Sequence, residues 1–220
     1  VHYDIPKSLE GYYQETGRAG RDGGEGQCIC FYSPKDIERL RKFQQGKPVS
    51  EQEISNQLLF ETQSYAESSI CRRKLLLHYF GEDYKKDDCG SCDNCRKTYK
   101  MVDATELLGL ILETIHQLNE KFRAEHIVDI IRGKESAGVL AYKHTELENF
   151  GCAEDENEAN LHAIIRQAMV TGYIKKDIES YGDLKLTPDG KKFMKRPSRF
   201  EVPIEVHNDD EDADMEAGIG

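Results

Sequence analysis

The sequence has no apolar stretch long enough to cross a bilayer, and its first residues lack the basic flank and apolar run of a signal peptide. It also has no phosphate-binding loop of the form G-x-x-x-x-G-K-S/T and no acid-rich Mg²⁺-binding motif to accompany one. We therefore expect a cytoplasmic protein without a membrane partner. We also expect that these 220 residues alone do not hydrolyse ATP.

Basic residues are missing from positions 205–220, where seven of the acids lie. The net charge of −11 therefore leaves only −4 for the rest of the chain, which is nearly balanced. Acid runs of this kind are typically solvated and disordered, and a specific binding role is the alternative. We predict an acidic disordered tail over residues 201–220.

The first residues alternate between strand and loop signals. Short β runs at 1–3 and 27–32 flank a glycine-rich loop. Cys28 and Cys30 occupy alternate positions in the second run, as small buried side chains do more often than metal ligands. The chain opens directly in the first of these runs, with Val1 in place of a Met, and we take it as a piece of a longer protein.

Helix signals follow from residue 33 onward. Ser33 with Pro34 is an N-cap and a first-turn proline, which predicts a helix over 34–45 that ends at Gly46. Ser50 with Glu53 makes a capping box for a second helix that reaches about residue 66. A third helix is predicted over 72–80. These three helices lead into a cysteine cluster.

After residue 102 the apolar side chains recur with helical spacing. Helices are predicted over 107–118 and 124–132, and a third has its inward positions between 161 and 169. Two strands at 173–178 and 184–186 follow, with a polar turn between them. Three helices and a β-hairpin make a winged helix. Thr187 then caps one further short helix.

Two arginines, each behind a glycine, lie three positions apart in the segment Tyr-Gln-Glu-Thr-Gly-Arg-Ala-Gly-Arg-Asp-Gly at 13–23. Helical spacing would aim both guanidinium groups in one direction, where they suit a phosphate chain that gains charge during hydrolysis. A surface turn with two ion-paired arginines is the alternative. The run resembles the sixth motif of superfamily 2 helicases, and together with 4–6 and 12–13 it resembles the RecQ form in particular.

This resemblance implies roles for three residues. Gln14, Arg18 and Arg21 would face a nucleotide held by another motor lobe, with Arg21 as the arginine finger. ATP and Mg²⁺ would be cofactors of the full-length parent only. The chain would begin within the second RecA-like lobe of that parent.

Cys89, Cys92 and Cys95 follow one another at two-residue gaps, and Cys71 lies 18 positions before the first of them. Four thiolates hold Zn²⁺ in closed structural sites, and disulfides are disfavoured in a reducing cytoplasm. Unrelated free cysteines are one alternative, and an iron–sulfur cluster, which usually brings a further Cys and Pro, is another. The segment 71–95 is similar to the RecQ zinc-binding subdomain, in which all four cysteines hold one Zn²⁺.

Cations near the cysteines and on the predicted hairpin are candidates for sequence-independent contact with DNA phosphates. The candidates are Arg72, Arg73, Lys74, Lys175, Lys176 and Lys185. Ordinary solvated charges are the alternative. The resemblance to RecQ winged-helix domains implies duplex and single-strand junctions as partners.

The same resemblance puts the hairpin tip near the point of strand separation, and Tyr181 lies at that tip in this sequence. An aromatic ring there can stack on the last base pair, and an exposed turn tyrosine without a role is the alternative. The acids within 154–158 depart from the family pattern and would repel phosphate at the start of the third helix. We therefore expect weak DNA binding that salt disrupts.

These patterns predict a mixed α/β multidomain protein. It comprises the end of a second RecA-like lobe (1–46), a helical four-cysteine zinc module (47–101), a winged helix (102–200) and the acidic tail. The resemblance implies a part of an ATP-dependent 3′-to-5′ DNA helicase of repair and recombination, associated with the nucleoid if bacterial. A stand-alone zinc and winged-helix DNA-binding regulator is the rival, and it leaves the segment 14–21 without a purpose.

Overall fold

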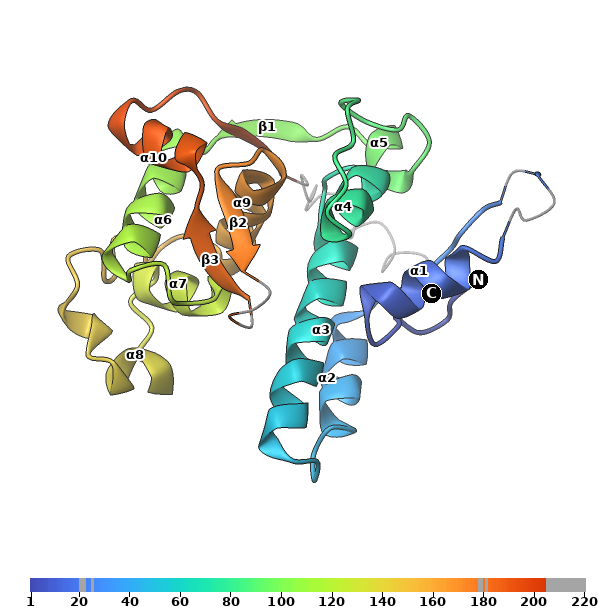
Figure 1. Ribbon diagram of the computed structural model, residues 1–220, viewed down its shortest axis with the longest axis horizontal. Helices are drawn as coiled ribbons and strands as arrows, with labels where there is room; N and C mark the ends of the chain where they lie inside the picture. The colour runs from blue at the N-terminus through green and yellow to red at the C-terminus, as the bar shows by residue number, and fades with distance from the viewer. Residues whose placement is uncertain (20–22, 25, 178–179, 181, 205–220) are drawn as a thin grey trace, which may run out of the picture.

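The computed structural model describes residues 1–19, 23–24, 26–177, 180 and 182–204. Two bodies lie side by side, and the long helix α3 is the part of the first body that faces the second (Figure 1). The first body contains α1 (Leu9–Thr16), α2 (Pro34–Lys42), α3 (Val49–Glu67), α4 (Arg72–Tyr79) and α5 (Asp93–Arg96). In the described ranges no helix is long and apolar enough to span a membrane.

The second body contains helices and two pairs of strands. Its helices are α6 (Thr105–Gln117), α7 (Ala124–Ile131), α8 (Ala137–Ala141), the 3-10 turn η1 (His144–Glu146), α9 (Glu158–Val170) and α10 (Pro188–Lys195). Its strands are β1 (Lys100–Asp103), β2 (Ile174–Asp177), β3 (Asp183–Leu186) and β4 (Glu201–Ile204). Helices α6, α7 and α9 and the β2–β3 hairpin form the predicted winged helix.

Helices α6, α7 and α9 bury one apolar face each in a shared core. Burial of such a side chain contributes about 1.5–3 kcal/mol, so this cluster supplies most of the stability of the second body. Leu107 and Met169, which we predicted to point inward, are only partly buried against the cluster. The other predicted inward positions are confirmed as buried: Leu108, Ile111, Leu112, Ile115, Leu118, Leu161, Ile164, Ile165 and Ala168.

The hairpin is antiparallel, with Ile174 opposite Leu186 and Lys175 opposite Lys185. Ile174, Leu184 and Leu186 are buried on the face that packs on the helices. After the hairpin the chain passes very close to itself at α10, where a Cβ added to Gly190 would lie 2.2 Å from the carbonyl oxygen of Tyr173. A side chain cannot be accommodated there, which accounts for a glycine inside the first turn of a helix.

Strands β1 and β4 pair antiparallel, with Lys100 opposite Ile204 and Asp103 opposite Glu201. The pairing differs from the prediction, which placed residues 201–204 in the acidic tail. Val202 is 1% exposed and packs in the core, so its burial fixes β4 despite the acids that follow. A five-residue helix, α8, was also not predicted.

The beginning of the chain departs further from the prediction. Residues 27–32 form no regular strand, and Cys30 makes only an isolated parallel bridge with His2. Cys28 and Cys30 are exposed, which contradicts their expected burial. Within the described part of the chain the backbone of this run is hydrogen-bonded to His2, and residues 27–31 are exposed.

The predicted cap of α2 is confirmed, and the predicted cap of α3 is wrong. Ser33 and Asp36 form a reciprocal capping box, in which the Ser33 N–H donates to Asp36 Oδ2 at 3.0 Å. Helix α3 begins at Val49 after Pro48, without a side-chain cap. Proline fixes its own φ and stops the helix from extending backward, so Ser50 already lies inside the helix.

Helix α3 of the first body packs against the second body (Figure 1). Phe60 of α3 packs against the winged-helix core, and its ring lies 5.5 Å from the ring of His162 on α9. Just beyond α3, the Ser69 hydroxyl donates to the carbonyl oxygen of Pro203 at 2.7 Å. The zinc module and the winged helix therefore meet along this helix.

Candidate zinc centre and nucleic-acid interface

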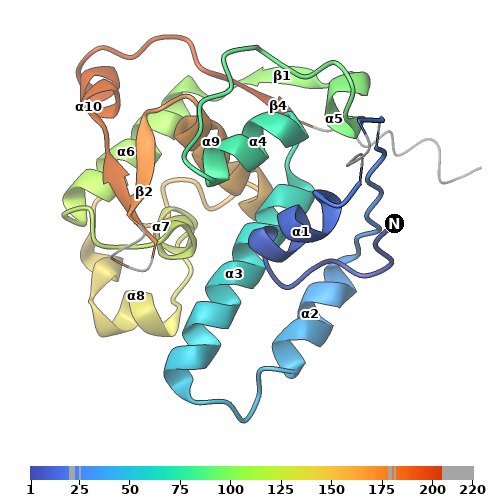
Figure 2. The same cartoon turned by 45° about the vertical axis from the view of Figure 1, so that its right-hand side comes forward.

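Helices α4 and α5 lie close together (Figure 2). Four cysteine sulfur atoms meet where these helices begin. Cys71 directly precedes α4, Cys92 directly precedes α5, and Cys95 lies within α5. All four Sγ atoms, including that of Cys89, lie within 4.8 Å of one another. The Cys89–Cys95 separation is 3.8 Å and the Cys92–Cys95 separation is 3.3 Å. A tetrahedral Zn²⁺ with sulfur ligands at about 2.3 Å needs neighbouring sulfurs about 3.8 Å apart, so the cage fits one ion.

Hydrogen bonds around the cage stabilise thiolates. The N–H groups of Arg72 and Cys95 each donate to Cys92 Sγ at 3.4 Å, and the Ser91 hydroxyl donates to Cys89 Sγ at 3.4 Å. Desolvation acts to raise the pKa of Cys89, but these Ser91 bonds and nearby backbone N–H groups outweigh it and lower the pKa to about 6. Burial raises the pKa of Cys71, so its ionisation depends on a bound cation. Four protein ligands leave no open position, which makes the site structural.

Asn94 joins the cage to the segment before α4. Its Nδ2 donates to the carbonyl oxygens of Ser68 at 2.6 Å and Ile70 at 2.7 Å, and its Oδ1 accepts from the Tyr99 hydroxyl at 2.9 Å. The side chain is 5% exposed. From the sequence, the small polar residues between the cysteines are expected only to form turns. The sequence signal for this role is the position of Asn94 between two cysteine ligands. A side-chain amide there can be buried, because it has both a donor and an acceptor that can bond to nearby backbone and side chains.

Arg72 is turned toward the protein rather than toward a free surface. Its Nε and Nη2 donate to the Asp93 carboxylate at 3.1 and 2.9 Å, and its Nη1 donates to the carbonyl oxygen of Tyr65. The guanidinium also lies 5.3 Å from the centre of the Tyr65 ring. Burial acts to raise the pKa of Asp93, but Arg72 outweighs it and the pKa lies below its ordinary value. Arg72 therefore clamps α4 to α5.

The remaining predicted DNA contacts divide into two groups. Lys176 forms an ion pair with Glu61 of α3, and Lys185 donates to the Glu120 carbonyl oxygen and lies 3.9 Å from Asp177. Arg73, Lys74 and Lys175 have no ion-pair partner within the described ranges. Arg73 and Lys175 are exposed and Lys74 is half-buried. Tyr181 lies outside the described residues.

The structure describes only part of the segment that we predicted to face a nucleotide. Ser8 caps α1 by accepting from the Gly11 N–H at 3.1 Å. Gln14, on α1, and Arg18, in the turn after it, are both exposed. Arg21 lies outside the described residues, so the expected alignment of the two arginines stays a prediction.

The acids before α9 have local roles in the structure. Asn157 caps α9 by accepting from the Ala159 N–H at 2.8 Å, and Glu158 pairs with Arg132 at 3.0 Å. Glu154 and Asp155 are exposed. Negative charge in the first turn of a helix is favourable, so Glu158 stabilises α9. Repulsion of phosphate by the acids within 154–158 stays a prediction.

Comparison with known proteins agrees with this arrangement. Residues 98–211 match the RQC domain family, and residues 34–96 match the RecQ zinc-binding family. The chain belongs to the RecQ family. The RecQ zinc-binding match names the metal of the four-cysteine cage, which leaves the iron–sulfur alternative without support. It begins at residue 34 and so includes α2, which we had placed in the RecA-like lobe.

Named relatives of this RecQ-family chain are longer proteins. It is 34% identical over 208 residues to the ATP-dependent DNA helicase RecQ of Pasteurella multocida, covering 94% of this chain and 32% of that protein. It is 33% identical over 206 residues to the ATP-dependent DNA helicase RecQ of Haemophilus influenzae, covering 93% and 33%. The ATP-dependent DNA helicase hus2/rqh1 of Schizosaccharomyces pombe is 35% identical over 186 residues, covering 82% and 14%. The chain thus spans about a third of the two bacterial relatives.

Proposed function

We propose that this chain is the zinc-binding and winged-helix part of an ATP-dependent DNA helicase. The observation that carries the proposal is a continuous set of contacts from α1 to the hairpin. Tyr79 of α4 donates to Glu10 of α1, the thiol cage holds the other end of α4, and Glu61 of α3 pairs with Lys176 of β2. A metal-braced module thus links the segment predicted to face the nucleotide with the hairpin predicted to meet DNA.

In this proposal the chain supplies cations to a nucleotide bound by another lobe. Gln14, Arg18 and Arg21 face its phosphates, and Arg21 is the arginine finger. A supplied arginine of this kind accelerates phosphoryl transfer by about 10³ to 10⁵. ATP and Mg²⁺ are therefore cofactors of the full-length protein, and the chain alone contributes no binding loop for either.

The DNA contacts we propose start from the basic side chains that have no ion-pair partner among the described residues. Arg73, Lys74 and Lys175 are the cations for phosphate, and Tyr181 is the wedge at the strand junction. Arg72, Lys176 and Lys185 contribute through the protein contacts described above. Unwinding would run 3′ to 5′ at duplex and single-strand junctions during repair and recombination, at the nucleoid in a bacterial cell.

The test compares the full-length protein with the chain alone. In the full-length protein, Arg21→Ala should lower DNA-stimulated ATP hydrolysis by about 10³ or more while fork affinity is kept. Arg196→Ala, at an exposed arginine directly after α10, is the matched control and should retain activity. The chain alone should not hydrolyse ATP.

Two results would contradict the proposal. One is ATP turnover by the chain alone that disappears on Arg21→Ala. The other is a natural gene without an ATP-binding lobe, which would favour the regulator. A regulator would also bind one DNA sequence in preference to others, and a helicase part would not.

A further inference from the structure

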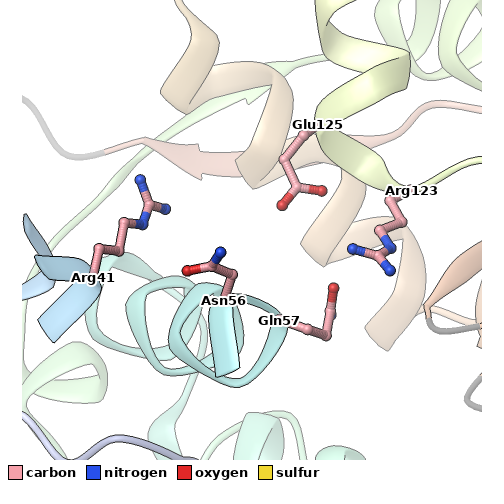
Figure 3. Close-up of a pocket in the computed structure, with 5 residues that line it drawn as sticks. All are labelled: Arg41, Asn56, Gln57, Arg123 and Glu125. Carbon is pink, nitrogen blue, oxygen red and sulfur yellow. The ribbon is translucent and has the colours of Figure 1, made fainter. Parts of the chain in front are cut away.

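A polar cleft lies where α2 and α3 meet the start of α7 (Figure 3). Arg41 of α2, Asn56 and Gln57 of α3, and Arg123 and Glu125 at the start of α7 line it, and its volume is about 250 Å³. A water molecule occupies roughly 30 Å³ in the liquid, so the cleft has room for a phosphodiester group. We call it the Arg41–Arg123 cleft.

The two arginines of this cleft are not neutralised by ion pairs. They stand on opposite sides of it, with Glu125 above and the two amides below (Figure 3). Neither guanidinium has an ion-pair partner in the part of the chain that the structure describes. Arg39, which lines a second cleft, differs because it pairs with Asp4 and with Asp36. Uncompensated guanidinium groups that converge on one space are suited to an anion.

The charges of both arginines act on Glu125, which is exposed at the surface. The protein around its carboxylate partly removes it from water and so raises its pKa, and the guanidinium groups of Arg123 and Arg41 oppose that rise. An anion between the arginines would therefore be attracted by both and repelled by this carboxylate. Two positive charges against one negative charge leave the cleft net positive.

The cleft also lies directly beside the turn of the hairpin. A Cβ added to Gly182, which has φ of 100°, would lie 3.3 Å from Nε2 of Gln57. The same Nε2 donates to Glu61 at 3.0 Å, and Glu61 pairs with Lys176 of β2. Arg123 lies near Asp183, the first residue of β3. Burial raises the pKa of Asp183, and the positive charge of Arg123 opposes that rise. A nucleic-acid strand at the hairpin turn would pass the mouth of the cleft.

We propose that the Arg41–Arg123 cleft binds a backbone phosphate of a single DNA strand that passes the hairpin turn. Helices α3 and α7 wall the cleft, and duplex DNA, with a persistence length of about 150 base pairs, is too stiff to bend into it. A single strand is flexible enough to place one phosphate between the guanidinium groups. The inference rests on the proposed function, because it requires that forked DNA reaches the winged helix.

The test uses the whole zinc-loaded chain and a fluorescently labelled DNA fork with two single-stranded arms. Binding is measured by anisotropy over a series of salt concentrations, with a blunt duplex of the same length in parallel. Arg41→Gln and Arg123→Gln should each weaken fork binding roughly three- to tenfold, and the slope of log K against log salt should fall by about 0.7 for a lost single-strand contact. Blunt-duplex binding should not change.

Three further variants sharpen the result. Glu125→Gln should strengthen fork binding because it removes the repelling charge. Arg196→Gln, an exposed arginine outside the cleft, is the matched control and should leave the slope unchanged. The Arg41→Gln, Arg123→Gln double variant should lose less than the sum of the two, because one phosphate contacts both side chains.

Failure of this inference is distinguishable from failure of the proposed function. If the unaltered chain does not bind the fork at all, the proposed function fails with it. If the chain binds the fork and both arginine variants keep its affinity and salt slope, only the cleft assignment is overturned. A lower melting temperature with an unchanged slope overturns it as well, because the arginines then brace the two bodies. Arg123→Lys keeps the charge and should keep most of the slope if Arg123→Gln fails to fold.

Inorganic phosphate provides the last arm of the test. At constant ionic strength, phosphate should compete poorly with the fork, because a strand brings further contacts to the surface. The strand assignment would be overturned if phosphate abolished fork binding at concentrations that leave duplex binding unchanged, both for the unaltered chain and for Arg196→Gln. The cleft would then be a site for free anions.

Discussion

The zinc module and the winged helix hold their shapes by different means. The continuous apolar cluster lies entirely between residues 104 and 202, in the winged helix. In the first body the buried apolar side chains are scattered, and α4 has no buried residue at all. A segment of this kind cannot be stabilised by burial alone. Its order comes from the thiol cage, from Asn94 and from the Arg72–Asp93 pair, so the metal takes the place of a core.

Removal of the metal should therefore unfold the zinc module and leave the winged helix folded, which is the largest difference expected between the two bodies. Cys92→Ser should abolish zinc binding and unfold α4 and α5, because a structural zinc contributes about 10–16 kcal/mol to a small module. The winged helix should keep its cooperative melting transition. Zinc content and limited proteolysis measure the two effects. Cys152→Ser, at an exposed cysteine outside the cage, is the control. Retention of zinc and melting temperature by Cys92→Ser would contradict the comparison.

The reverse change should damage the winged helix alone. Ile131 is completely buried, and Ile131→Ala should destabilise that unit by about 2–5 kcal/mol through lost burial and a cavity. The bound zinc per chain should stay the same. The free energy of unfolding from urea titration and a zinc assay test the two statements. Loss of zinc from Ile131→Ala would mean that the bodies fold as one unit.

Asn94 should show how much the polar contacts add to the metal. Asn94→Ala leaves the carbonyl oxygens of Ser68 and Ile70 without this donor inside the protein, which costs about 1–3 kcal/mol. Zinc affinity should fall while the four ligands remain. Competition with a chelator measures it, and equal zinc affinity in Asn94→Ala and the unaltered chain would show that the cage alone orders the module.

The contact between the two bodies should weaken as the pH falls below 6.5. Burial, assisted by the charge of Arg166, lowers the pKa of His162 to about 4, whereas an unfolded histidine titrates near 6.5. The unfolded chain therefore binds more protons between these values. The contribution of neutral His162 is complete above pH 6.5 and is lost as the pH falls toward 4, on the order of 3 kcal/mol. His162→Gln should flatten the difference in urea midpoint across this range, and a parallel profile for both proteins would exclude the effect.

The features that the sequence predicted well depend on local patterns. The spacing of Ile111, Ile115 and their neighbours places them on one helix face, and the gaps of the four cysteines suffice for a tetrahedral cage. The helix pattern and the gaps between Cys89, Cys92 and Cys95 repeat within one or two turns of chain, whereas Cys71 lies 18 positions before Cys89. Local patterns therefore predict the winged-helix core and three of the metal ligands, and the family resemblance supplied Cys71 and the identity of the metal.

The features that were missed depend on long-range contacts. The β1–β4 pair joins residues about a hundred positions apart, and no local signal marks it. The basic side chains were ambiguous for a similar reason. A lysine or arginine has the same local pattern whether it meets DNA or a carboxylate, and Arg72 and Lys176 turned out to have carboxylate partners on other elements. The segment around Gln14 and Arg18 was clear as a motif, and its role toward a nucleotide stays a prediction.

The β1–β4 pair also has a mechanical consequence. Because Lys100 faces Ile204, the chain enters and leaves the winged helix at the same edge. Tension between those two points would peel the strands apart one residue pair at a time, as a zipper opens, instead of shearing all the bonds together. Under tension the β1–β4 pair should therefore open before the core of the winged helix unfolds.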